Sequence, residues 1–188
     1  LSEESKQQIN HWRAQHLAVL QGKEQKAEKK PIPLDNYHIT LVFLGATSPA
    51  DEAELISQLR QLQSSPFKAE AFALHLDKTA YWLKPKLIYL APSHVPPALL
   101  QLQQTVHNIV KTIGLPTESR PYQPHVSLYR KISPSLFQQL EQAGLPLPDV
   151  PLAITHFALY QSQSCINKGV DGDVNGVTYP VVERFGLG

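Results

Sequence analysis

The sequence predicts an α+β fold in which antiparallel sheets carry helices on their outer faces. Stretches rich in β-branched and aromatic residues alternate with stretches whose apolar residues recur at helical spacing. A His-aliphatic-hydroxyl-Leu motif occurs twice, at residues 38–41 and 125–128, and a Ser-Pro pair follows each copy. The 188 residues, 42% of them hydrophobic, suffice for one sizeable core. We therefore expect a single domain over residues 1–188, built from a duplicated strand-helix-strand unit.

The N-terminal part predicts a helix, a loop and a strand. A helix is expected over residues 3–20, because Ser2 is a suitable N-cap and apolar residues, Trp12 among them, recur on one face. Residues 22–30 are polar and lysine-rich, which indicates a loop. Residues 37–44 are rich in β-branched and aromatic types, which favours a mostly buried strand.

The middle of the chain predicts two helices with strands between them. Ser48-Pro49 is typical of a helix start, with serine as the cap and proline at the first helical position. Pro96-Pro97 begins a second helix, which Gly114 ends. The strands expected between these helices cover residues 67–76, 81–83 and 87–91.

The C-terminal part repeats the strand-then-helix order. The second motif lies in a strand predicted over 124–131, and Ser133-Pro134 begins a short helix that Gly144 ends. Residues 145–151 contain three prolines and are expected to be a connector. Two strands complete the chain, and Asn175-Gly176 in the polar loop between them predicts a hairpin turn; these strands are residues 154–161 and 177–185.

Composition restricts the classes of function. The net charge is +1, so an anion site has to be a local arrangement of donors, and a small phosphate fits better than a long duplex. One cysteine excludes an intramolecular disulfide and an all-cysteine zinc site. We find no signal peptide and no apolar run of the roughly 18 residues that a membrane span needs. We therefore predict a cytoplasmic protein without a membrane segment.

The two motifs indicate acid–base chemistry. In a strand, residues i and i+2 share a face, so His38 would lie beside Thr40, and His125 beside Ser127. A single copy is most simply a half-buried strand with its polar side toward solvent. Two copies facing each other would place a neutral and a protonated imidazole around one phosphate, with two hydroxyls as donors to its oxygens. This scheme requires neither a metal ion nor a cofactor.

The motifs resemble the paired H-x-T/S-x signatures of the two-histidine (2H) phosphoesterase superfamily. The resemblance is strongest to its bacterial RNA 2′,3′-cyclic phosphodiesterase branch, also called the 2′-5′ RNA ligase family. Outside the motifs, three stretches are similar to that branch, and the resemblance covers nearly the whole chain; the stretches are residues 8–13, 120–124 and 156–162.

The resemblance implies a bilobal fold with two pseudo-symmetric sheets, and hydrolysis of 2′,3′-cyclic phosphates at RNA or nucleotide ends to 2′-phosphates, with reversible 2′-5′ ligation as an associated reaction. It implies His38 as the general acid toward the 3′ oxygen and His125 as the general base toward water. Thr40 and Ser127 would hold phosphate oxygens. The implied partners are RNA ends or cyclic nucleotides, and we expect a monomer. The family's first strand is expected to precede Leu1.

Three further residues are candidates for substrate contacts. Arg130 stands where this branch commonly has arginine and could reach the phosphate, with a surface ion pair as an equally weighted alternative. Tyr129 and Phe43 are candidates for stacking on a base. Tyr129 shares the parity of Ser127 and is the preferred candidate, whereas the parity of Phe43 predicts a core position.

Other functions remain open at this stage. One is a binding module that holds a phosphorylated nucleotide or RNA end without turnover. Another is a 2H enzyme acting on 2′-5′ oligoadenylate or on cyclic ADP-ribose phosphate. The segment Lys23 to Lys30 could touch an RNA backbone, although a solvated loop is favoured. Residues 171–176 match half of a calcium loop, but Val182 stands where glutamate is required, so calcium is not expected.

Overall fold

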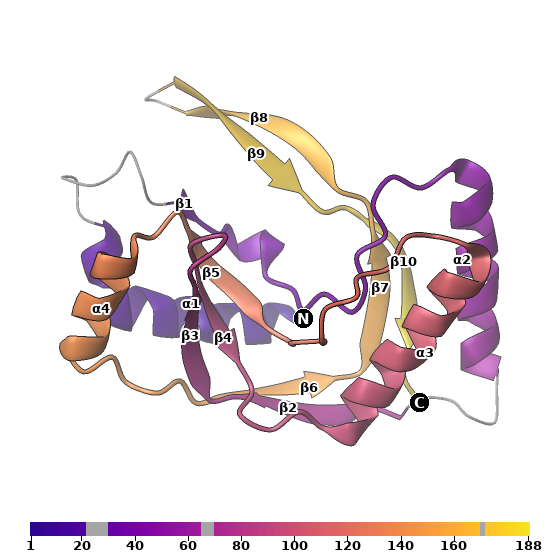
Figure 1. Ribbon diagram of the computed structural model, residues 1–188, viewed down its shortest axis with the longest axis horizontal. Helices are drawn as coiled ribbons and strands as arrows, with labels where there is room; N and C mark the ends of the chain where they lie inside the picture. The colour runs from indigo at the N-terminus through magenta and orange to yellow at the C-terminus, as the bar shows by residue number, and fades with distance from the viewer. Residues whose placement is uncertain (22–29, 65–69, 170–171) are drawn as a thin grey trace.

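The computed structural model describes residues 1–21, 30–64, 70–169 and 172–188 (Figure 1). The predicted α+β class is confirmed. The elements in chain order are α1 (Glu3–His16), β1 (Lys30–Pro31), α2 (Pro49–Ser64), β2 (Phe72–Leu76), β3 (Lys78–Trp82), β4 (Leu87–Ala91), α3 (Pro97–Ile113), β5 (Val126–Arg130), α4 (Pro134–Gln142), β6 (Val150–Ile154), β7 (His156–Tyr160), β8 (Gln163–Gly169), β9 (Gly172–Thr178) and β10 (Val181–Gly186). No described helix is both long enough and apolar enough to cross a membrane.

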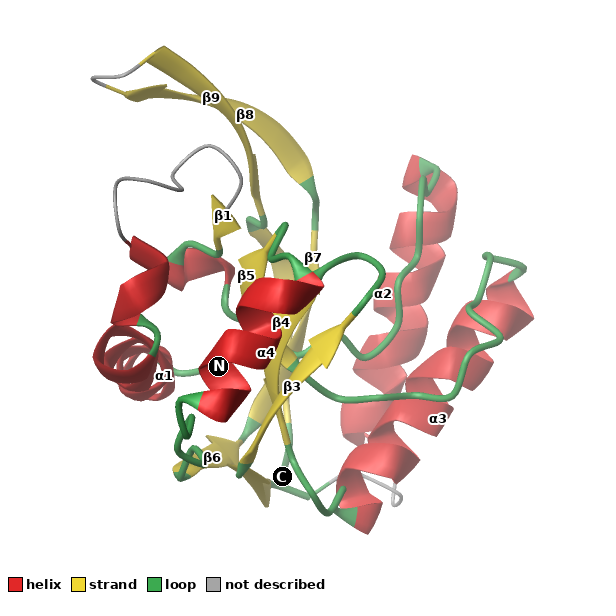
Figure 2. Cartoon of the chain, turned by 60° about the vertical axis from the view of Figure 1, so that its left-hand side comes forward, coloured by secondary structure: helices red, strands yellow, loops and turns green. Residues whose placement is uncertain are grey.

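The elements form two lobes, each with its own hydrophobic core. The first lobe consists of a four-stranded antiparallel sheet of order β1-β5-β4-β3 together with the helices α1 and α4 (Figure 2). In the second lobe, α2 and α3 pack together beside the two-stranded sheet β10-β7 (Figure 1). The pairs β2-β6 and β8-β9 are separate two-stranded sheets, so the strands are shared unequally between the lobes.

The predicted helix starts are confirmed. The hydroxyl oxygens of Ser2, Ser48 and Ser133 accept hydrogen bonds from backbone N–H groups three residues further on, at 3.1, 3.2 and 3.3 Å. Each serine thereby satisfies one of the four amides that a helix start leaves unpaired. The first helix ends at His16, earlier than predicted, because residues 18–21 form a tighter 3-10 turn that leaves Leu17 and Leu20 in the core.

Two predictions for the C-terminal part are wrong. The expected connector already contains the start of β6, where Val150 and Leu152 are buried and Pro151 is tolerated because β6 pairs with β2 alone. The expected loop after β7 is the antiparallel hairpin β8-β9. Asn175 pairs with Ile166 inside this hairpin, so the chain does not turn there. The strand-to-strand connection, residues 170–171, lies outside the described residues, as does most of the lysine-rich segment, residues 22–29.

The first motif is not in a regular strand, contrary to the prediction for residues 37–44. A strand is defined by hydrogen bonds to a neighbouring strand, and no described strand pairs with this segment. The segment instead runs extended between the lobes. Leu41 packs against both hydrophobic cores, and the chain bends at this residue. The bend breaks the two-residue alternation on which the predicted side-chain directions depended.

Candidate active site

The two motif histidines are held by the same local device. The Nδ1–H group of His38 donates to the carbonyl oxygen of Asn36 at 2.7 Å, and that of His125 donates to the carbonyl oxygen of Gln123 at 2.9 Å. A carbonyl oxygen can only accept, so Nδ1 carries the proton in both rings. Each neutral imidazole therefore keeps Nε2 as its free, basic nitrogen.

The carbonyl that orients His38 is itself anchored. The side-chain amide of Asn36 donates a hydrogen bond of 2.7 Å to the carbonyl oxygen of Val177 in β9. The first motif is thereby tied to a strand that follows it by more than a hundred residues. This hydrogen bond fixes the backbone that leads into His38, even though no described strand pairs with the motif.

The electrostatic environments of the two imidazoles overlap. Burial is the main cause that lowers the pKa of each histidine below the ordinary value of 6.5, and the hydrogen bond to the backbone carbonyl partly opposes it. The charge of Arg130 lowers the pKa of both rings, and the charge of His125 further lowers the pKa of His38. The two histidines and Arg130 therefore lie within electrostatic reach of one another.

A β-bulge in β5 decides which side chains reach the site. Tyr89 of β4 pairs with Ser127, while the preceding Ile88 pairs with Tyr129, so β5 has one extra residue at this point. The extra residue reverses the alternation of side chains beyond Leu128. Ser127 is half-buried, Tyr129 is buried, and Arg130 is exposed, where its charge acts on both imidazoles.

The prediction that Tyr129 stacks on a base is wrong. Its side chain is 2% exposed and belongs to the core, because the bulge turns it inward. The guanidinium of Arg13 lies 5.5 Å from the centre of this ring and 5.5 Å from that of Tyr37, which precedes His38. Burial raises the pKa of Tyr37 to about 12. Tyr129 thus helps to hold the two motifs together from inside.

The prediction that Phe43 is a core residue is also wrong. Its side chain is 65% exposed, because the bend at Leu41 turns it away from the neighbours that line the second core. Phe43 is therefore available for stacking on a base, unlike Tyr129.

Four aromatic residues surround the imidazoles, and none of them was predicted from the sequence as part of the site. The ring of His38 lies 5.0 Å from that of Tyr179 and 6.5 Å from that of Tyr160, measured between ring centres. The ring of His125 lies 4.5 Å from that of Trp82 and 5.4 Å from that of Tyr89. Only the register of β4 against β5 could have signalled Tyr89, and register is not visible in the sequence.

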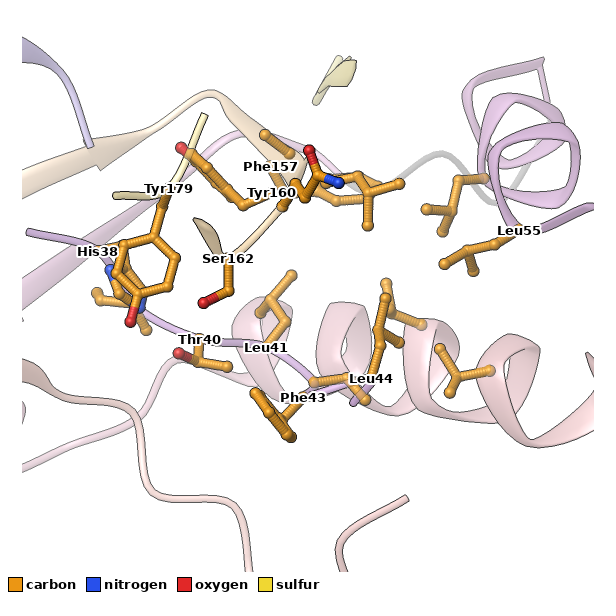
Figure 3. Close-up of a pocket in the computed structure, with 18 of the residues that line it drawn as sticks. His38, Thr40, Leu41, Phe43, Leu44, Leu55, Phe157, Tyr160, Ser162 and Tyr179 are labelled. Carbon is orange, nitrogen blue, oxygen red and sulfur yellow. The ribbon is translucent and has the colours of Figure 1, made fainter. Parts of the chain in front are cut away.

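A cavity of about 450 Å³ opens beside His38 (Figure 3). Thr40, Phe43, Tyr160 and Tyr179 line its polar and aromatic part, while its remaining lining is largely aliphatic. The volume lies within the range of small-molecule sites. Thr40 is exposed and lies two residues after His38 in the same segment.

The described residues include no group of three or more His, Cys, Asp or Glu side chains placed to hold a metal ion. The segment that partly matches a calcium loop begins at residue 171, outside the described part of the chain, and residues 172–178 form strand β9.

The fold is two-lobed and α+β, with one histidine motif in the segment between the lobes and the other at β5, within electrostatic reach of each other. This architecture is that of the two-histidine phosphoesterases. A model of the 2′-5′ RNA ligase superfamily matches residues 1–164, and the chain belongs to this superfamily. The resemblance seen in the sequence is confirmed.

Individual relatives agree with this assignment. An RNA 2′,3′-cyclic phosphodiesterase of Escherichia coli K12 is 31% identical over 164 residues, which cover 86% of this chain and 82% of the relative. An RNA 2′,3′-cyclic phosphodiesterase of Bacillus subtilis 168 is 32% identical over 118 residues, covering 57% of this chain and 62% of the relative. The crystal structure of E. coli LigT complexed with 3′-AMP superimposes with a TM-score of 0.79 at 27% identity, covering 100% of this chain and 93% of LigT.

Proposed function

We propose that the protein hydrolyses 2′,3′-cyclic phosphates at RNA or nucleotide ends to 2′-phosphates, with His38 as general acid and His125 as general base. The observation that carries the proposal is the pair of matching Nδ1 hydrogen bonds, which leave the Nε2 atoms of both rings free within one shared electrostatic environment. The names of the curated relatives support the substrate class.

The reaction balances with these two groups alone. Neutral His125 takes a proton from water through Nε2 as the water oxygen forms a bond to phosphorus. The bond from phosphorus to the 3′ oxygen breaks, and protonated His38 gives its proton to that oxygen. The products are a 2′-phosphate and a 3′-hydroxyl. A 5′-hydroxyl of RNA in place of water would give a 2′-5′ linkage by the same steps.

The remaining polar groups bind the phosphate as hydrogen-bond donors. The hydroxyls of Thr40 and Ser127 donate to the non-bridging oxygens, on which negative charge increases as water attacks. The exposed guanidinium of Arg130, whose charge already acts on both imidazoles, offers two parallel N–H donors to the same group. Phe43, Tyr160 and Tyr179 provide the aromatic wall on the His38 side for the base of the cyclic nucleotide.

Incubation with 2′,3′-cyclic AMP tests the proposal. We expect 2′-AMP as the product, separated from 3′-AMP by chromatography, because His38 is assigned to the 3′ oxygen. Saturable binding without any product would favour the non-catalytic binding module. Formation of 3′-AMP would contradict the assignment of the leaving oxygen. 2′-5′ oligoadenylate and cyclic ADP-ribose phosphate serve as competing substrates, and preferential turnover of either would replace the proposed substrate class.

We expect chelation to leave the activity unchanged. The proposed steps use two imidazoles, two hydroxyls and a guanidinium, and none of them needs a Lewis acid. Initial rates with 2′,3′-cyclic AMP should be equal before and after dialysis against EDTA. A loss of turnover that added Mg²⁺ or Mn²⁺ restores would contradict the metal-free scheme.

The pH dependence should be bell-shaped with its maximum on the acid side. Activity rises as His125 loses its proton and falls as His38 loses its own. Burial lowers the pKa of both groups below 6.5, so the optimum of kcat/KM should lie below pH 6.5. A bound phosphate anion raises both pKa values, so the kcat profile should shift to higher pH. An optimum of kcat/KM above pH 7 would contradict this assignment.

A further inference from the structure

One end of the four-stranded sheet concentrates positive charge. Lys30 of β1 pairs with Arg130 of β5, and Arg130 pairs with Leu87 of β4, which in turn pairs with Trp82 of β3. These residues form one row across the sheet. The turn from β3 to β4 and the chain just beyond β5 lie at the same end (Figure 1) and add further lysines. We call this surface the basic edge; its residues are Lys30, Lys84, Lys86, Arg130 and Lys131.

The basic edge has no acidic partner in the part of the chain that the structure describes. All five side chains are exposed, and among the described residues none of them is in an ion pair. The sequence has no Asp or Glu over residues 78–117 or 119–140, which supply four of the five cations. In a chain with a net charge of +1, such a cluster is a local feature and not the result of a basic composition.

The basic edge continues directly from the site. The charge of Arg130 acts on both histidines, and the ring of Trp82, in the same row of the sheet, lies 4.5 Å from that of His125. Trp82 also contacts Tyr89 at 4.4 Å between ring centres. An anionic strand that leaves the site on this side therefore meets aromatic rings first and lysines next, the combination that single-stranded nucleic acid binds.

The backbone holds two of the lysines in an unfavourable conformation. Lys86 has φ 64° and Lys131 has φ 62°, a left-handed region that residues other than glycine rarely adopt. The amide of buried Ile132 donates to the carbonyl oxygen of Lys86 at 3.1 Å, which ties the two lysines together. Fixed, strained backbone of this kind is concentrated at functional sites.

We propose that the basic edge binds the sugar-phosphate backbone of an RNA strand whose cyclic phosphate end lies between His38 and His125. This inference rests on the proposed function and extends it, because it makes the preferred substrate an oligonucleotide and not a mononucleotide. RNA is favoured over an acidic peptide because the edge begins at the phosphate site and is lined by aromatic rings.

The test compares two substrates in a variant that leaves the site intact. In K84Q/K86Q/K131Q, the KM for an oligoribonucleotide ending in a 2′,3′-cyclic phosphate should rise about tenfold or more, with kcat retained. The kinetics with 2′,3′-cyclic AMP should not change. The dependence of the oligonucleotide KM on salt should weaken, because fewer counterions are released on binding.

Two control variants make the result decisive. K78Q/K111Q removes two exposed lysines elsewhere on the described surface and should leave both KM values unchanged. K84E keeps both left-handed lysines and should change the oligonucleotide KM in the same direction, which covers the case that the triple variant is poorly folded. An oligonucleotide KM equal to that of the wild type in both edge variants, or an equal rise with the mononucleotide, would overturn the proposal.

Failure of the proposed function would appear differently. The wild type would then turn over neither substrate. Fluorescence anisotropy with a labelled oligoribonucleotide would decide the matter in that case, since the basic edge predicts weaker binding by the triple variant. Unchanged binding by the triple variant would overturn the proposal. It would also be overturned if polyglutamate displaced the labelled oligoribonucleotide as effectively as unlabelled RNA does, because the preferred ligand would then be an acidic peptide.

Discussion

Replacing either His38 or His125 by alanine is expected to lower kcat for 2′,3′-cyclic AMP by about 10²–10⁴-fold, the usual contribution of a general acid or base. Both rings are half-buried and bonded to the backbone through Nδ1, so each presents Nε2 in a fixed direction. Alanine removes the proton carrier, and water in its place is a far poorer acid and base near neutral pH. Steady-state rates with each variant measure the loss.

The fold should survive these substitutions. Neither histidine belongs to a hydrophobic core, so the melting temperature and the far-UV circular dichroism should stay near those of the wild type. His11→Ala is the matched control, because His11 is exposed on α1 and takes no part in the scheme. A histidine whose alanine variant keeps near wild-type turnover has no role in the proton transfers.

Thr40→Val and Ser127→Ala are each expected to lower kcat/KM by about 10²-fold or more, as the removal of one donor to a developing oxyanion does elsewhere. Valine keeps the shape of threonine and removes only the hydroxyl. The two hydroxyls come from separate segments, one between the lobes and the other in β5, so both losses together test whether these segments act on one phosphate. Kinetics with 2′,3′-cyclic AMP provide the measurement.

Thr47→Val is the matched control for these hydroxyl variants. Thr47 lines the same cavity, and its hydroxyl makes only a 3.5 Å contact with the carbonyl oxygen of Gly45. Its variant should retain wild-type kcat/KM. If the Thr40 variant behaves like the Thr47 variant, the first motif contributes its histidine alone, and the proposed pairing of hydroxyls is wrong.

Much of the molecule could be read from local patterns. The serine caps before α2 and α4 depend on hydrogen bonds that span only three residues. The pairs Ser48-Pro49 and Ser133-Pro134 therefore predict where these helices begin. The strand Leu87–Ala91 has the predicted bounds because it is a continuous run of apolar and aromatic residues. The two histidine motifs are equally local. Their resemblance to the paired signatures of the two-histidine phosphoesterases is what made a two-lobed phosphoesterase the expected class.

Local sequence patterns did not predict the direction of the side chains at the site. The sequence predicted that Tyr129 faces the substrate and that Phe43 is buried, and the structure shows the reverse. Parity along a strand holds only while each residue has one partner. The bulge of β5 opposite Ile88 and Tyr89 breaks this rule for Tyr129, and the bend at Leu41 in an unpaired segment breaks it for Phe43.

The sequence by itself determined the residue types of the site, the order of the four α-helices and the family. The tertiary structure decided which atoms meet. The aromatic rings around His125, the anchoring of Asn36 by Val177 and the row from Lys30 to Trp82 all join residues distant in the chain. Such contacts depend on strand register and lobe packing, whose energies are summed over the whole chain and leave no signature in a short stretch of sequence.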